Sequence, residues 1–79
     1  MFGFSEGKVK TVLTITDLHC SMCEATVNEA IRNKFDVKKV KSSAREKETI
    51  IWSDEPLPED ELRAVIAETG YTLTDIATE

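Results

Sequence analysis

The stretch Asp17-Leu18-His19-Cys20-Ser21-Met22-Cys23-Glu24 joins a β-like segment to a helix-like segment, and the rest of the chain is organised around it. It holds both cysteines, the single histidine and one of the two methionines of a 79-residue chain. Ser21 and Glu24 stand three residues apart, just ahead of apolar positions at helical spacing, which is the pattern of a capping box. We therefore expect a helix to begin here, with Cys20 in the preceding loop and Cys23 in the first turn.

The placement of the two cysteines bears on their chemistry. Free backbone N–H groups and the positive end of the helix dipole favour negative charge, so they are expected to lower thiol pKa values here. The carboxylate of Glu24 works against this, so only the direction is predicted. Two intervening residues let both sulfur atoms converge on one point, and soft sulfur donors favour Cu(I), Zn(II) and similar ions over hard ions such as magnesium. Cys20 and Cys23 are therefore candidate metal ligands.

The flanking segments alternate between strand and helix patterns. Residues 8–16 predict a first strand, because apolar and β-branched side chains alternate along it. The first helix is expected from about Met22 to Phe35. Its apolar face comprises Cys23, Val27, Ala30, Ile31 and Phe35, and its outer face comprises Asn28, Glu29 and Arg32. Residues 37–42 and 48–53 predict two further strands joined by a polar hairpin at 43–47.

The C-terminal part predicts one more helix and one more strand. Residues 54–58 break the chain, and Pro58 suits the first position of a second helix that begins with acidic residues. Its apolar face comprises Leu62, Val65, Ile66 and Thr69. Gly70 is expected to end this helix. Residues 71–76 predict a last strand, followed by a tail at 77–79.

The resulting order is βαββαβ. Its usual solution is an α+β, ferredoxin-like sandwich, in which two helices cover one face of a four-stranded antiparallel sheet. In that arrangement the loop after the first strand and the loop before the fourth lie at the same end of the molecule. We therefore expect Cys20, Cys23 and Gly70-Tyr71 to be neighbours.

Size and composition limit the class of protein. At 8.9 kDa and 41% hydrophobic content the chain suits one small domain, which we place at residues 8–77 after a flexible leader at 1–7. The leader lacks the basic and apolar regions of a signal peptide, and no run of apolar residues is long enough to span a membrane. We therefore expect a soluble cytoplasmic protein. In that reducing compartment a CxxC pair favours metal binding or redox chemistry over a structural disulfide.

Charge is distributed unevenly along the chain. The net charge is −5, yet residues 1–47 carry nine Lys/Arg and six Asp/Glu, whereas residues 48–79 carry one and nine. Nucleic-acid binding usually needs a dominant basic stripe, so the overall acidity argues against it. A surface with two signs of charge suits an oriented protein partner, although solubility alone also explains it.

With this element order, and with CxxC at the first strand-to-helix junction, residues 8–77 resemble the heavy-metal-associated domain family, which includes copper chaperones and metal-binding domains of P-type ATPases. The family motif Gly-Met-x-Cys-x-x-Cys corresponds here to residues 17–23, so both metal-binding cysteines carry over. Gly70-Tyr71 resembles the bacterial form, in which the tyrosine lies close to the metal. The departures are Asp17 for Gly and Leu18 for Met, and Leu is a near-isosteric packing substitute.

The resemblance implies a non-enzymatic protein that binds one Cu(I) and hands it to a copper-transporting P-type ATPase. It implies a monomer when free of metal, with a metal-bridged dimer as a further state. Within the same class, a Zn(II), Cd(II) or Hg(II) carrier assisted by His19 or Asp17 is the alternative. Three further residues could contact the site. His19 and Met22 are possible ligands, although for each of them an exposed position without a ligand role is favoured. Tyr71 is expected to lie beside the metal loop.

Two hypotheses from other classes of function stay open. One is a small dithiol oxidoreductase that uses the two cysteines as a reversible disulfide, although the chain lacks the length of a thioredoxin fold. The other is a metal-free module that docks through Lys38, Lys39 and Lys41 or through the open face of the sheet. Trp52 is expected to pack, and its indole N–H then needs a partner.

Overall fold

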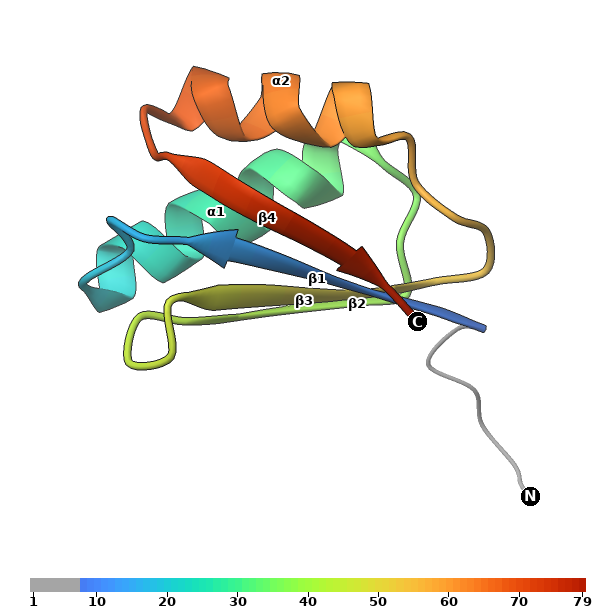
Figure 1. Cartoon of the computed structure of the whole chain (residues 1–79), viewed down its shortest axis with the longest axis horizontal. Coiled ribbons are helices and arrows are strands. Elements are labelled where there is room, and N and C mark those ends of the chain that lie inside the picture. The colour runs from blue at the N-terminus through green and yellow to red at the C-terminus, as the bar shows by residue number, and fades with distance from the viewer. Residues whose placement is uncertain (1–7) are drawn as a thin grey trace.

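The computed structural model describes residues 8–79 and contains six elements. They are β1 Val9–Ile15, α1 Ser21–Lys34, β2 Lys39–Ser43, β3 Glu48–Ser53, α2 Glu59–Thr69 and β4 Leu73–Thr78. The strands form one antiparallel sheet in the order β2-β3-β1-β4, and both helices cover the same face of it (Figure 1). The predicted ferredoxin-like sandwich is thereby confirmed. The leader predicted at residues 1–7 lies outside the described residues, and the domain limits 8–77 stay a prediction.

The core lies between the sheet and the two helices. Alternation along β1 turns Thr11, Leu13 and Ile15 toward the helices, as the sequence pattern predicted. Helical spacing supplies the opposite wall, because residues three and four apart share one face of a helix. The buried helical residues are Cys23, Val27 and Ile31 of α1 and Leu62, Val65 and Ile66 of α2. Cys23 thus stands at the end of the buried row of α1, where the core meets the loop.

The last strand differs from the prediction. It begins at Leu73 rather than Tyr71 and continues through the residues expected to form a tail. Ala77 and Thr78 pair with Val12 and Thr11 of β1, so the tail at 77–79 is wrong. Glu79 extends the ladder, because its N–H donates to the carbonyl of Lys10 at 2.7 Å. The sequence pattern missed this because only backbone pairing with β1, and no apolar alternation, fixes these residues.

The second helix also begins one residue later than expected. Pro58 is the N-cap residue rather than the first helical position, and its carbonyl accepts from the N–H of Leu62. The other end agrees with the prediction. Gly70 follows Thr69 with φ 90°, a left-handed conformation that glycine adopts without the clash of a β-carbon. This turn sends the chain directly toward the loop that carries the cysteines.

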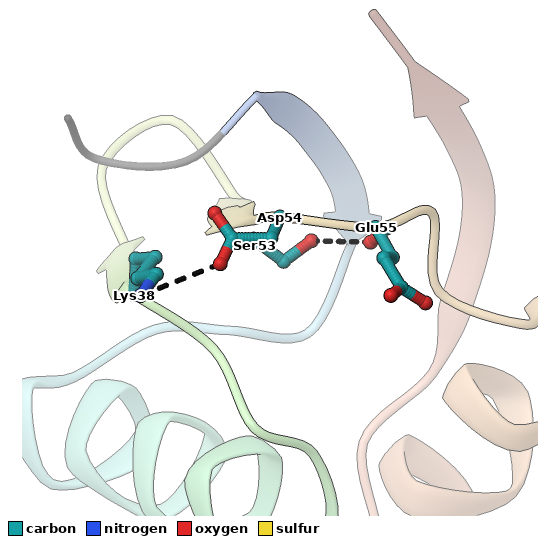
Figure 2. Close-up of polar contacts among 4 residues, drawn as sticks. All are labelled: Lys38, Ser53, Asp54 and Glu55. Atoms are coloured by element: carbon teal, nitrogen blue, oxygen red, sulfur yellow. Dashed lines mark hydrogen bonds and ion pairs between the residues drawn. The ribbon is translucent and has the colours of Figure 1, made fainter.

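Short polar contacts fasten the end of the sheet that lies away from the cysteines. Figure 2 shows the hydroxyl of Ser53 donating to the carbonyl of Glu55 at 2.7 Å, where the chain leaves β3. The same view shows Lys38 paired with Asp54 at 3.4 Å, which ties the start of β2 to the end of β3. Both charged groups are half exposed, so this pair contributes little to stability.

Three connections meet at the opposite end of the molecule. They are the β1–α1 loop, the β2–β3 hairpin and the α2–β4 connection, which all lie at the left of Figure 1. The first and third were expected to be neighbours, and this is confirmed by a hydrogen bond from the N–H of Thr72 to the carboxylate of Asp17 at 2.8 Å. Neither helix of residues 8–79 is long and apolar enough to cross a membrane.

Candidate metal centre

The first helix is capped differently from the prediction. Cys20, not Ser21, is the N-cap residue, and its sulfur accepts a hydrogen bond from the N–H of Cys23 at 3.3 Å. Glu24 does not complete a capping box. Its carboxylate instead accepts from the N–H of Ala44 at 2.6 Å, in the β2–β3 hairpin. The local sequence pattern predicted a capping box of Ser21 and Glu24. In the structure the thiol of Cys20 caps the helix in place of the Ser21 hydroxyl, and the Glu24 carboxylate binds the N–H of Ala44, which is distant in the sequence.

The two sulfur atoms lie side by side. Both cysteines are free thiols, and their Sγ atoms are 2.7 Å apart. Cys20 is exposed on the loop, whereas Cys23 is buried at the end of the core. The hydrogen bond from Cys20 is the largest of the influences that lower the pKa of Cys23 from 9.0 to about 7. At neutral pH this site therefore holds a substantial fraction of thiolate, the form that binds metals.

Tyr71 is the second partner of the Cys23 sulfur. Its hydroxyl hydrogen-bonds to Cys23, which further lowers the pKa of that thiol. The same hydrogen bond raises the pKa of Tyr71 to about 12, because the phenol is the donor and gives up its proton less readily. The expected contact between Tyr71 and the cysteine loop is therefore confirmed. The expected depression of the Cys23 pKa is also correct in direction, although side-chain hydrogen bonds rather than the helix dipole lead it.

His19 is close to the sulfurs but faces them with the wrong atom for a ligand. Its Nδ1 lies 4.0 Å from the Cys23 sulfur and 2.8 Å from the carbonyl oxygen of Asp17. A carbonyl only accepts, so Nδ1 carries the proton and has no lone pair to offer a metal. Within residues 8–79, His19, Cys20 and Cys23 form the one group of three potential ligands, with their ligand atoms within 4.8 Å of one another.

Asp17 is occupied elsewhere. Its carboxylate accepts from the N–H of Thr72 at 2.8 Å and from the Thr72 hydroxyl at 3.2 Å. The hydrogen bond from the Thr72 backbone is the main reason that the pKa of Asp17 is lowered. The Asp17 carboxylate thus links the loop that carries the cysteines to Thr72, the residue just before β4. The sequence suggested an assisting ligand at this position, and the structure shows a brace between two loops.

Two other residues of the motif, Leu18 and Met22, differ in their exposure to solvent. Leu18 has no solvent exposure and packs in the core beneath the loop, as its substitution for the family methionine suggested. Met22 is 78% exposed and points away from the core. Its thioether therefore stands at the rim rather than inside the pair of thiols.

Two of the lysines at the start of β2 contact other side chains of this chain. Lys38 pairs with Asp54, and the ammonium of Lys39 lies 5.3 Å from the centre of the Trp52 ring. Trp52 is half-buried on the open face of the sheet, so it packs beneath a lysine rather than in the core. Both contacts run from the start of β2 to β3 or to the residue after it, so these two lysines help to hold the two strands together.

Sequence reasoning missed three residues that shape the loop: Thr72, Ala44 and Lys47. Thr72 and Ala44 contribute backbone donors to Asp17 and Glu24. Lys47 donates from its ammonium to the carbonyl of Leu18 at 2.8 Å. Backbone donors leave no trace in a sequence pattern, and a lysine in a polar hairpin is indistinguishable from a solubilising one.

No protein-family model and no curated protein matches the sequence. Solved structures do match. A mutant of the copper chaperone Atx1 from Synechocystis PCC6803, in a trimeric form, is 30% identical over 80% of this chain and 97% of its own, with a TM-score of 0.68.

Two further structures match with lower identity. The N-terminal domain of ZntA in the Zn(II) form has a TM-score of 0.75 at 18% identity, covering 85% of this chain and 90% of its own. The yeast copper transporter domain Ccc2a has a TM-score of 0.72 at 22% identity, covering 91% and 96%. By its fold, this chain belongs with the heavy-metal-associated metal-binding domains.

Proposed function

We propose that this protein is a metallochaperone that binds one Cu(I) ion between Cys20 and Cys23. The observation that carries the proposal is the adjacency of two free sulfurs, one exposed and one with its pKa lowered to about 7. Such a pair supplies thiolate at neutral pH at a rim that a partner can reach. The similarity to a copper chaperone over most of the chain supports the same choice.

Binding requires a small movement of the sulfurs. A metal–sulfur distance of about 2.3 Å puts two ligand sulfurs about 3.8 Å apart in tetrahedral geometry and about 4.6 Å apart in linear geometry. The sulfurs start at 2.7 Å, so they must separate. Cys20 is exposed and can rotate, whereas Cys23 is fixed in the core. The buried thiol therefore anchors the ion, and the loop thiol adjusts to it.

The same asymmetry suits release. A thiolate of the partner adds to the bound Cu(I), giving a three-coordinate ion that bridges the two proteins. The exposed Cys20 sulfur then leaves, a second partner thiolate adds, and Cys23 leaves last. Each step exchanges one copper–sulfur bond for another with no change of oxidation state. The acceptor we propose is a copper-transporting P-type ATPase or its metal-binding domain, met in the cytoplasm. Complementary charge would speed that encounter.

The second candidate cargo is Zn(II), or another soft divalent ion. The observation in its favour is the position of His19 within 4.8 Å of both sulfurs, because zinc takes additional ligands and accepts imidazole nitrogen. For this to happen Nδ1 must leave the Asp17 carbonyl and lose its proton, or the ring must turn to offer Nε2. Two-coordinate Cu(I) needs no such rearrangement, so we assign the site to Cu(I).

An anaerobic titration against a Cu(I)-selective chelator tests the proposal. The reduced protein should retain one Cu(I) per chain, and Zn(II) should be displaced by an equivalent of Cu(I). Cys20→Ser combined with Cys23→Ser should abolish retention while the far-UV circular dichroism is unchanged. Size-exclusion chromatography of the loaded protein separates a monomer from a metal-bridged dimer.

Two results would oppose this assignment. Preference for Zn(II) over Cu(I) would favour the divalent carrier. No retention of either ion, together with turnover in a dithiol-reductase assay, would favour redox chemistry at the same cysteines.

A further inference from the structure

The β2–β3 hairpin contains a residue in an unusual conformation. Lys47 has φ 60°, and no other non-glycine residue in the described part of the chain has a positive φ. The left-handed region is unfavourable for a lysine because its β-carbon crowds the backbone. Such a conformation persists only where surrounding contacts compensate for it.

Two polar groups of Lys47 contact the end of β1 and the loop that follows it. Its backbone carbonyl accepts from the N–H of Ile15 at 2.9 Å, at the last residue of β1. Its ammonium donates to the carbonyl of Leu18 at 2.8 Å, and this contact is partly buried. The bond to Ile15 extends the β1–β3 ladder by one residue pair, and the ammonium adds a contact inside the turn that leads to Cys20.

The Leu18 carbonyl is well placed to transmit this restraint. The Leu18 side chain is fully buried beneath the loop, and its N–H donates to the Ile15 carbonyl at 3.2 Å. With its side chain, N–H and carbonyl all engaged, Leu18 is held in one orientation. Cys20 follows two residues later, so the orientation of Leu18 limits where the exposed thiol can lie.

We propose that Lys47 is a positioning residue for the metal site, acting through the Leu18 carbonyl to keep Cys20 within reach of an ion held by Cys23. This inference rests on the proposed function, because it assigns Lys47 a role in metal retention. Groups bonded directly to metal ligands typically change metal affinity by about 10- to 100-fold when removed. Lys47 acts one step further out, through Leu18, so we expect a loss at or below the lower end of that range.

The test uses substitutions that spare the backbone. Lys47→Asn tolerates the left-handed conformation and keeps the carbonyl bond to Ile15, but its side chain is too short to replace the ammonium. Lys47→Gly serves as a second variant that relieves the conformation entirely. Lys47→Arg restores a long cationic donor. Lys41→Gln is the matched control, because it removes the same charge from an exposed position on β2.

We expect Lys47→Asn and Lys47→Gly to retain Cu(I) roughly 3- to 10-fold less tightly in chelator competition. The Leu18 carbonyl loses a partner in both variants, so the metal-free Lys47→Asn protein should still unfold cooperatively but at a Tm several degrees lower, by about 4–8 °C for each kcal/mol lost. Lys47→Arg should recover most of the affinity, and Lys41→Gln should match the wild type. Amide hydrogen exchange in the metal-free protein should quicken at Leu18, whose N–H donates to the Ile15 carbonyl, in the Asn and Gly variants only.

Separate outcomes identify which idea is at fault. Wild-type affinity and exchange in Lys47→Asn would overturn the positioning role, and so would an equal loss in Lys41→Gln, which would indicate charge alone. Failure of the wild-type protein to retain Cu(I) would instead overturn the proposed function, and faster exchange in the Asn variant would then still establish the restraint on the loop.

Discussion

Replacing Leu18 by alanine probes how far the cysteine loop depends on the core. The side chain has no solvent exposure and packs with the residues of the central cluster. Truncation of a fully buried leucine costs about 2.7–5 kcal/mol, because transfer free energy is lost and a cavity remains. For a domain of this size each kcal/mol lowers the Tm by roughly 4–8 °C. The metal-free Leu18→Ala variant should therefore unfold at least about 10 °C below the wild type.

Urea unfolding of the reduced, metal-free protein, followed by circular dichroism, supplies the free energies. Leu73→Ala is the matched control, because Leu73 is only half-buried at the start of β4 and should cost clearly less. Leu18→Met keeps the volume and should cost less than about 1.5 kcal/mol. A Leu18→Ala variant that loses no more stability than Leu73→Ala would refute the claim that this loop is anchored by its leucine.

Four other predictions concern the polar contacts of the site. The ultraviolet absorbance of thiolate in the reduced, metal-free protein should rise with a midpoint near pH 7, because the Cys23 thiolate is populated above that pKa and lost below it. Tyr71→Phe should move this midpoint upward by deleting a hydrogen bond to the sulfur, and an unchanged midpoint would contradict that contact. His19→Ala should leave one Cu(I) bound per chain, since Nδ1 serves the Asp17 carbonyl, and loss of the ion would make His19 a ligand. Glu24→Ala should cost about 1–2 kcal/mol in urea unfolding by leaving the hairpin N–H unpaired, whereas Glu24→Gln, which keeps an acceptor, should cost less.

The pH dependence of stability follows from the same thiol. The pKa of Cys23 is lower in the folded protein than its ordinary value of 9.0. The stabilisation that this provides is complete above pH 9.0 and is lost as the pH falls through about 7. Urea unfolding of the metal-free protein across this range should therefore show a contribution that Cys23→Ser removes.

The features that sequence predicted well are those with a repeating pattern. Alternation in β1, helical spacing in α1 and α2, and the glycine after α2 each identify one element without reference to the others. The limits of β3 at Glu48 and Ser53 agree with the predicted range 48–53 for the same reason. Element order then gave the fold, and the fold brought Tyr71 to the cysteines.

The features that sequence did not predict depend on partners distant in the chain. Thr78 belongs to β4 because it pairs with β1, and nothing in its neighbours indicates this. Glu24 has the spacing of a capping residue, yet a hairpin N–H twenty residues away in sequence competes for its carboxylate. From the sequence, Asp17 is available as an assisting metal ligand, but the fold places the N–H of Thr72 beside its carboxylate. Patterns of side chains carry no record of such backbone donors.

X-ray absorption at the copper edge, on anaerobic protein loaded with one equivalent of Cu(I), examines the two-sulfur site most directly. A site made by Cys20 and Cys23 alone gives two sulfur neighbours and no nitrogen neighbour around the metal in the monomeric form, and this is the result we expect. A nitrogen in the first shell, or a spectrum that does not change when Cys20 and Cys23 are both replaced by serine, would contradict it.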